Sequence, residues 1–237
     1  MKLPRFGVEG WLNSYEREAV YDIAGVSIEA LTLQELFELT GESETAFYQE
    51  LLAKKLNYGW IEGSPEFKKA VSQLYVSVTE NQILQTNGAT GANMLVLYGL
   101  IEPGDHVISL YPTYQQLYDI PKSLGADVDL WQVREENKWL PDLAELRQLI
   151  RPNTKMICIN NANNPTGAVM DDDYLRELVS IAKSCGAYIL ADEVYHPFTN
   201  TKVSSIIDLY EKGISVNSLS KTCLLYTSPS PRDVEES

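Results

Sequence analysis

The chain has 237 residues, of which 44% are hydrophobic, and a formal net charge of −14 from 19 basic and 33 acidic side chains. This length and apolar content are sufficient for one α/β domain with a buried core, and they exclude a chain that is disordered throughout. The acidic balance argues against non-specific binding to nucleic acid or to an anionic membrane, because both depend on clustered Lys and Arg.

The first 45 residues are predicted to form a helical N-terminal arm. One helix is expected from about Trp11 to Val20, and another over residues 32–39, TLQELFEL. In the second segment an apolar stripe at helical spacing ends at Gly41, a residue that commonly terminates helices.

A large domain is predicted from residue 46 to residue 222. A helix over residues 44–56 leads into it, and residues 58–64, YGWIEGS, form a loop interrupted by glycines. Pro65 then stands in the first turn of the next predicted helix, PEFKKAVSQLY, where its missing N–H is tolerated.

Short apolar runs then alternate with helical segments, which is the pattern of a mostly parallel sheet with helices on both faces. Six strands are predicted, at residues 82–86, 106–111, 127–133, 155–160, 187–193 and 214–220. Helices are predicted between them, at about residues 90–101, 114–124, 141–150 and 171–185. The expected fold class is therefore α/β, with three layers around one sheet.

Five polar motifs follow predicted strands, where the carboxyl ends of an open sheet bind ligands. The first, TNGATGAN at 86–93, would present the N–H groups of Gly88 to Thr90 at a helix N-terminus, a place that binds phosphate. A turn that merely starts a helix is an equal alternative. The motif is neither a Walker loop nor a dinucleotide-binding fingerprint.

Two further motifs carry residues that could face a planar ligand. YPTYQ, at 111–115, places Tyr114 just past a strand end, where its ring could lie over such a ligand or could instead pack under a loop. NNANNPTG, at 160–167, leaves Asn164 able to donate an amide hydrogen bond into the cleft, although its residues are also those of an ordinary turn.

The fourth motif, YILADEVY at 188–195, buries a strand that ends at Asp192 and Glu193. A carboxylate in so apolar a setting needs a cationic partner to stay charged, and a protonated ring nitrogen would serve. The alternative is that both acids face solvent or cap the next turn. Tyr195 follows closely enough for its hydroxyl to face the same ligand.

The fifth motif, SVNSLSK at 215–221, places Lys221 directly beyond the last predicted strand, beside Ser218 and Ser220. A lysine is by default a solvated surface charge. In a cleft near cationic or apolar groups its pKa falls, and the neutral amine is a nucleophile toward carbonyls. An aldehyde cofactor is therefore the expected partner of Lys221.

Cysteine usage and the lack of long apolar runs indicate the compartment. Cys158, Cys185 and Cys223 are odd in number and too widely spaced for a metal motif, which favours reduced thiols and no metal site. No run is long enough for a signal peptide or a membrane span. We expect a cytoplasmic protein that binds small molecules.

In their order, GAT, YPTY, NNPTG, DEVY and SLSK resemble the fold-type I pyridoxal-phosphate enzymes, specifically the class I/II aminotransferases related to aspartate aminotransferase. The resemblance runs from about Tyr58 to Lys221. It implies the large domain of that fold and pyridoxal 5'-phosphate as cofactor. It also implies transfer of an amino group between an α-amino acid and a 2-oxo acid.

The resemblance assigns roles around the cofactor ring. It implies that Lys221 forms the internal aldimine and moves a proton between the substrate α-carbon and the cofactor. Asp192 would pair with the pyridine nitrogen and keep it protonated. Tyr195 and Asn164 would hydrogen-bond the phenolic oxygen, and Tyr114 would stack on the ring.

The resemblance also assigns residues to the phosphate. Ala89 and Thr90, together with Ser218, match phosphate ligands of the family. Tyr58 matches a tyrosine that reaches the phosphate of the neighbouring subunit, which implies a homodimer for the full-length protein.

The resemblance fails after Thr222. In the family the lysine is followed by a glycine-rich segment with a phosphate-binding arginine, then by a strand between the first and last of those predicted, and then by a small C-terminal domain. Residues 223–237, CLLYTSPSPRDVEES, have no counterpart there. We expect them to be a non-native or disordered tail, and this fragment to be unstable or inactive.

Other functions are compatible with parts of this pattern. A lyase or cyclising enzyme of the same fold, working by β- or γ-elimination, would need the same residues up to Lys221. A non-catalytic module that binds the cofactor is a further alternative. A nucleotide-binding α/β protein would leave the placement of Asp192, Asn164 and Lys221 unexplained.

Overall fold

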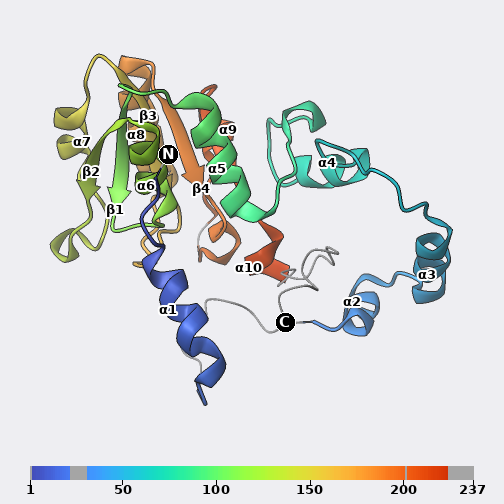
Figure 1. Cartoon of the computed structure of the whole chain (residues 1–237). Coiled ribbons are helices and arrows are strands. Elements are labelled where there is room, and N and C mark those ends of the chain that lie inside the picture. Colours follow the sequence, from blue (N-terminus) through green and yellow to red (C-terminus); the bar gives the residue numbers. More distant parts are fainter. Residues whose placement is uncertain (1, 22–30, 201, 224–237) are drawn as a thin grey trace.

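The computed structural model describes residues 2–21, 31–200 and 202–223. Its centre is one parallel sheet with the strand order β2-β1-β3-β4-β5 (Figure 1). The strands are β1 (His106–Tyr111), β2 (Asp127–Gln132), β3 (Thr154–Asn160), β4 (Tyr188–Asp192) and β5 (Gly213–Val216). The predicted α/β class is confirmed.

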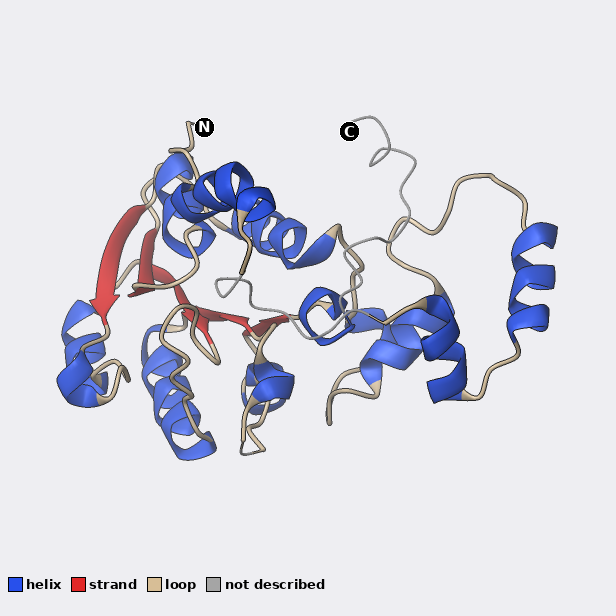
Figure 2. Cartoon of the chain, turned by 90° about the horizontal axis from the view of Figure 1, so that it is seen from below, coloured by secondary structure: helices blue, strands red, loops and turns tan. Residues whose placement is uncertain are grey.

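Helices cover both faces of the sheet, so the molecule has the three predicted layers (Figure 2). One face carries α5 (Gly88–Leu100) and α6 (Gln116–Leu124), and the other carries α7 (Leu143–Leu149), α8 (Asp172–Cys185) and α9 (Ile206–Leu209). Alternation along β3 explains the two cores, because successive side chains of a strand point to opposite faces. Met156 and Cys158 pack toward α5 and α6, whereas Ile157 and Ile159 pack toward α7 and α8.

Helix ends lie where capping residues predict them. Asp171 accepts a hydrogen bond from the backbone N–H of Tyr174 at the start of α8, and Gly186 ends that helix in a left-handed conformation with φ of 72°. Helix α2 (Leu33–Thr40) likewise begins with a capping box on Thr32 and ends at Gly41.

The N-terminal arm lies partly on the sheet domain and partly apart from it. Helix α1 (Gly7–Tyr15) starts beside α6, where the backbone N–H of Gly7 donates to Gln115 Oε1 at 3.0 Å. Helices α2 and α3 (Glu44–Ala53) lie away from the sheet, and α4 (Pro65–Ser72) returns toward it (Figure 1). The helix predicted from about Trp11 to Val20 instead runs from Gly7 to Tyr15, and a 3₁₀ turn, η1 (Glu16–Glu18), follows it.

Two predicted strands require correction. Residues 82–86 form no strand: Gln82 ends η2 (Glu80–Gln82), residues 83–86 follow it without regular structure, and within the described ranges no strand lies beside them to complete a ladder. The strand predicted over 214–220 ends at Val216. The hydroxyl of Ser218 then accepts the N–H of Ser220 and begins a helix, α10 (Leu219–Cys223).

Short 3₁₀ turns complete the described elements, at η3 (Glu135–Asn137) and η4 (His196–Phe198). Across the described ranges, no helix is both long and apolar enough to cross a bilayer. The predicted tail falls outside the described residues from position 224 onward.

Candidate functional site

The predicted motifs meet at one edge of the sheet. Because β1, β3, β4 and β5 are parallel, the segments that follow them leave the sheet on the same side. These segments contain Tyr114, Asn164, Tyr195 and Lys221 respectively.

Asp192, the last residue of β4, is the most enclosed charge at this edge. Its side chain is 2% exposed and accepts hydrogen bonds from Asn93 Nδ2 at 2.8 Å and from the backbone N–H of Val194 at 3.3 Å. Burial raises the pKa of Asp192 to about 6, although these two hydrogen bonds act to lower it. A cation beside the carboxyl would favour its ionised form.

Glu193 is also buried, but it serves the opposite face of the sheet. Its carboxylate accepts hydrogen bonds from Ser205 Oγ and Ser215 Oγ, each at 2.6 Å, and from the backbone N–H of Ile206 at 2.8 Å. These bonds tie the start of α9 to the sheet. The interpretation that both acids face solvent is therefore wrong, while Glu193 does cap the helix that begins at Ile206.

Tyr114 connects the first motif to the charged groups. Its hydroxyl shares a 3.3 Å hydrogen bond with Thr90 Oγ1, and its ring lies 5.2 Å from that of Phe6. Burial raises the pKa of Tyr114, and the nearby charges of Asp192 and Lys221 act on it in opposite directions. Tyr114 therefore interacts with three of the other predicted site residues: Thr90, Asp192 and Lys221.

The asparagine-rich loop after β3 is organised by residues that sequence reasoning did not single out. Asn160 accepts the backbone N–H of Asn164 at 2.6 Å and donates to the backbone carbonyl of Asp192 at 2.8 Å. Asn163 is 3% exposed and accepts the hydroxyl of Thr113 at 2.9 Å. The run of polar residues after an apolar strand was the available signal for both.

Lys221 lies in α10, the short helix that follows β5, and its side chain is half-buried. In the preceding turn Ser218 Oγ donates to Ser220 Oγ at 2.9 Å and accepts the N–H of Ser220 at 3.1 Å. The serines beside Lys221 thus form the turn that positions the lysine at this edge.

The first turn of α5 contributes Ala89 and Thr90. Gly88 begins the helix with φ of 66°, which only glycine adopts without strain, and Thr86 Oγ1 donates to its carbonyl at 2.9 Å. The backbone N–H of Gly88, predicted to be free, already donates to the carbonyl of Thr86 at 2.9 Å. The N–H groups of Ala89 and Thr90 follow it in the first turn of this 13-residue helix, where N–H groups have no partner within the helix and can bind an anion.

The two remaining predicted residues differ in placement. Tyr195 is half-buried and follows Asp192 in the turn that begins η4. Tyr58 is 103% exposed, on the connection between α3 and α4 that lies away from the sheet (Figure 1). This chain therefore does not bring Tyr58 to the other eight residues.

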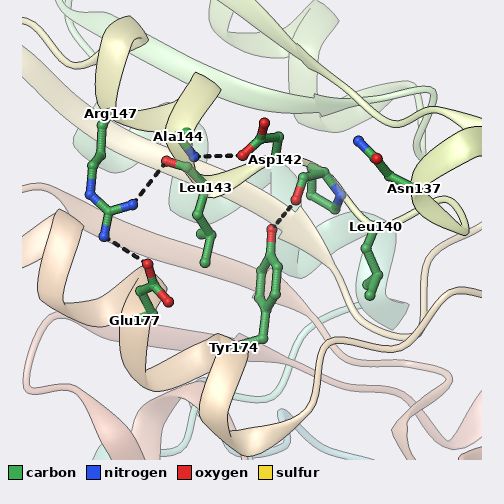
Figure 3. Close-up of a pocket in the computed structure, with 9 residues that line it drawn as sticks. Asn137, Leu140, Asp142, Leu143, Ala144, Arg147, Tyr174 and Glu177 are labelled. Atoms are coloured by element: carbon green, nitrogen blue, oxygen red, sulfur yellow. Dashed lines mark hydrogen bonds and ion pairs between the residues drawn. The ribbon is translucent and has the colours of Figure 1, made fainter.

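A pocket of about 530 Å³ lies between α7 and α8, away from the predicted site residues (Figure 3). Several of its polar groups are already paired: Arg147 with Glu177 at 2.7 Å, and the hydroxyl of Tyr174 with the carbonyl of Pro141 at 2.5 Å. None of the predicted site residues lines it. Among the described residues no group of three or more His, Cys, Asp or Glu could hold a metal ion.

The comparisons with known proteins all indicate the same family. Residues 43–227 match the family model of aminotransferase class I and II. The aspartate aminotransferase of Pyrococcus horikoshii is 34% identical over 187 residues, and the match covers 73% of this chain and 48% of the relative. The aspartate/prephenate aminotransferase of Thermus thermophilus is 30% identical, with 72% and 46% covered.

Solved structures agree with the sequence relatives. The crystal structure of a PLP-dependent aminotransferase from Streptococcus suis superposes with a TM-score of 0.92 at 73% identity, covering 98% of this chain and 61% of that chain. An alanine aminotransferase from Pyrococcus furiosus superposes with a TM-score of 0.68 at 29% identity, covering 75% and 47%. The chain spans about half the length of the curated relatives it matches. By its sequence and by its fold, this chain belongs to the class I and II aminotransferases.

Proposed function

We propose that the protein is a pyridoxal 5'-phosphate-dependent aminotransferase that moves an amino group between an α-amino acid and a 2-oxo acid. The observation that carries the proposal is Asp192, a carboxylate that is 2% exposed at the edge where Lys221 and Tyr114 also lie. Burial raises its pKa to about 6, and a protonated pyridine nitrogen would supply a positive charge that favours the ionised carboxylate.

The residues fit both ends of that cofactor. Asp192 would accept the N–H of the ring, and the first turn of α5 at Ala89 and Thr90, with Ser218, would hold the phosphate. Tyr114 would lie over the ring between them, which its hydrogen bond to Thr90 and its electrostatic interaction with Asp192 support.

The side chains at this edge would have distinct tasks in the reaction. When bound, the cofactor supplies an electron-poor ring that takes up the electron pair of the substrate Cα–H bond. Lys221 Nζ would hold the cofactor at its aldehyde group and would also carry the proton that leaves the substrate α-carbon. Asp192 would hold a proton on the ring nitrogen, and Asn164 and Tyr195 would donate hydrogen bonds to the phenolic oxygen.

The proposed assembly is a homodimer in which Tyr58 of one copy reaches the phosphate held by the other. The segment around Tyr58 supports it: Leu56, Tyr58 and Ile61 are 103%, 103% and 96% exposed, and Trp60 is 70% exposed. Four apolar side chains exposed to this degree within six residues are typical of surfaces that another subunit covers. The domain limits at residues 45 and 222 are likewise proposed, as is a cytoplasmic location, which the free thiols of Cys158 and Cys185 support.

The proposal is tested by incubating the full-length protein and pyridoxal 5'-phosphate with single α-amino acids and 2-oxoglutarate, because the fragment itself is expected to be inactive. We expect glutamate to form, and we expect Lys221→Ala to lower the rate by about 10²–10⁴-fold, because the proton carrier is lost. Pyruvate and ammonia released without a 2-oxo acid acceptor would contradict amino-group transfer and indicate elimination.

A further inference from the structure

Asn93 is an amide buried inside an otherwise apolar stretch of α5. Its side chain is 0% exposed, as is that of Leu97 one turn further along the same helix. Asn93 Nδ2 donates to Asp192 Oδ2 at 2.8 Å, across 99 residues of sequence. Its other polar atom, Oδ1, is buried and has no hydrogen-bond partner within the described ranges.

Burying the amide of Asn93 costs stability, and only its hydrogen bond to Asp192 offsets that cost. A buried amide oxygen without a partner loses its hydration and gains nothing in return. Leucine at the same position would pack against the sheet without that cost, as Leu97 does. The polar group of Asn93 is therefore directed at a single contact, a charge-assisted hydrogen bond to the carboxylate.

The contact also distinguishes the two oxygens of Asp192. Oδ2 accepts the 2.8 Å bond from Asn93, whereas Oδ1 accepts the longer 3.3 Å bond from the backbone N–H of Val194. A donor from the side chain of Asn93 stabilises the ionised form of the carboxyl and opposes the effect of burial on its pKa.

Helix geometry links this contact to the proposed phosphate site. Thr90 and Asn93 are three residues apart, so they lie on neighbouring positions of one helical face, about 4.5 Å apart along the axis. Thr90 contacts Tyr114, and Asn93 contacts Asp192. One rigid helix thus fixes the spacing between the residues proposed to hold the two ends of the cofactor.

We propose that Asn93 is a positioning residue: it fixes Asp192 Oδ2 and keeps the carboxylate ionised, so that Oδ1 faces the ring nitrogen of the bound cofactor. The cofactor part of this inference rests on the function proposed above. The contact between Asn93 and Asp192 does not depend on the cofactor.

The first test needs no cofactor. In the full chain labelled with ¹³C-aspartate, the pKa of Asp192 is measured by carboxyl NMR in wild type, Asn93→Leu and a control, Met94→Leu, from the adjacent position in α5. We expect Asn93→Leu to raise the pKa of Asp192 by about one unit, and Met94→Leu to leave it unchanged. An unchanged pKa in folded Asn93→Leu would overturn the inference.

The second test is a double-mutant cycle on the dissociation constant of pyridoxal 5'-phosphate, measured by fluorescence quenching. Asn93→Leu should weaken binding about tenfold in the wild-type background and have no further effect on Asp192→Asn. Equal weakening in both backgrounds would reduce Asn93 to a packing residue and overturn the inference. If wild type binds no cofactor, the proposed function fails, while the NMR titration still decides whether Asn93 acts on Asp192.

Discussion

At the scale of single residues, Asp192 at the end of β4 and Glu193 directly after it have different environments, because neighbouring side chains of an extended chain point to opposite faces of the sheet. Glu193 accepts three hydrogen bonds on the α9 face and is fully engaged in holding the fold. Asp192 faces α5, and burial raises its pKa from 3.8 to about 6. A buried carboxyl whose pKa is raised in this way is typical of a site that binds a cationic ligand.

This difference predicts that Asp192→Asn stabilises the cofactor-free protein at neutral pH. The folded-state pKa is raised, so the contribution of Asp192 to stability is present below about pH 4 and is lost as pH rises through about 6. At pH 7 we expect Asp192→Asn to increase the free energy of unfolding by about 1–3 kcal/mol in urea titrations. If the variant were less stable than wild type at pH 7, the claim that the buried carboxylate of Asp192 destabilises the cofactor-free protein would be contradicted.

Sequence patterns indicated candidate site residues but not their supporting contacts. Asp192 and Lys221 could be singled out because one ends an apolar strand and the other follows one. Asn93 could not be assigned a contact, because its partner lies 99 residues away and becomes adjacent only in the folded sheet. An asparagine among Met, Leu and Val in a helix was the signal that sequence alone provided.

At the scale of elements, prediction succeeded where capping residues define the ends of a helix. Asp171 caps the start of α8 and Gly186 ends it in a left-handed conformation, and both residues can be recognised from the local sequence. Residues 82–86 have the composition of a strand but are not one, because a strand also requires a neighbouring backbone. Helix α10 was missed because its start depends on the hydrogen bond that the backbone N–H of Ser220 donates to the hydroxyl of Ser218.

The amino ends of β1, β2 and β3 are joined by a buried histidine. His106 is 0% exposed, with Nδ1 2.8 Å from Thr154 Oγ1 and Nε2 3.1 Å from Asp129 Oδ2. Arg151 bonds to the carboxylates of Asp129 and Asp127 on its other side. Burial and the charge of Arg151 lower the pKa of His106, and they outweigh Asp129, which raises it.

The lowered pKa predicts acid sensitivity of the sheet. The unfolded state binds the proton more readily than the folded state, so the contribution of His106 to stability is present above about pH 6.5 and is lost as pH falls below that value. The free energy of unfolding should decline there with a slope of up to about 1.4 kcal/mol per pH unit. His106→Gln, which cannot titrate, should flatten that slope, and an unchanged slope would exclude His106 as its source.

At the scale of the whole molecule, the candidate site is assembled from segments that lie far apart in the chain. Residues from α5, the segments after β1, β3 and β4, and α10 meet at one edge, while Tyr58 lies apart. The exposed apolar segment around Tyr58 is the feature of the subunit that a second copy would cover.

The proposed dimer predicts the effect of a charge in that segment. Ile61 is 96% exposed, so Ile61→Asp should change the stability of a single subunit by less than about 0.5 kcal/mol. In a dimer it should place an unpaired charge in the interface and shift sedimentation from dimer toward monomer. Identical sedimentation of wild type and variant, across a range of protein concentrations, would argue that this segment is not the interface.

The central claim is that the amine of Lys221 condenses with the aldehyde of pyridoxal 5'-phosphate. The reaction would take place at the edge of the sheet where Asp192 and Tyr114 lie. Borohydride reduction in the presence of the cofactor, followed by peptide mass mapping, tests it most directly, with Lys221→Ala as the matched control. We predict one pyridoxyl adduct, located on Lys221 and absent from the variant. An adduct spread over surface lysines, or one that persists in Lys221→Ala at the same yield, would contradict the account.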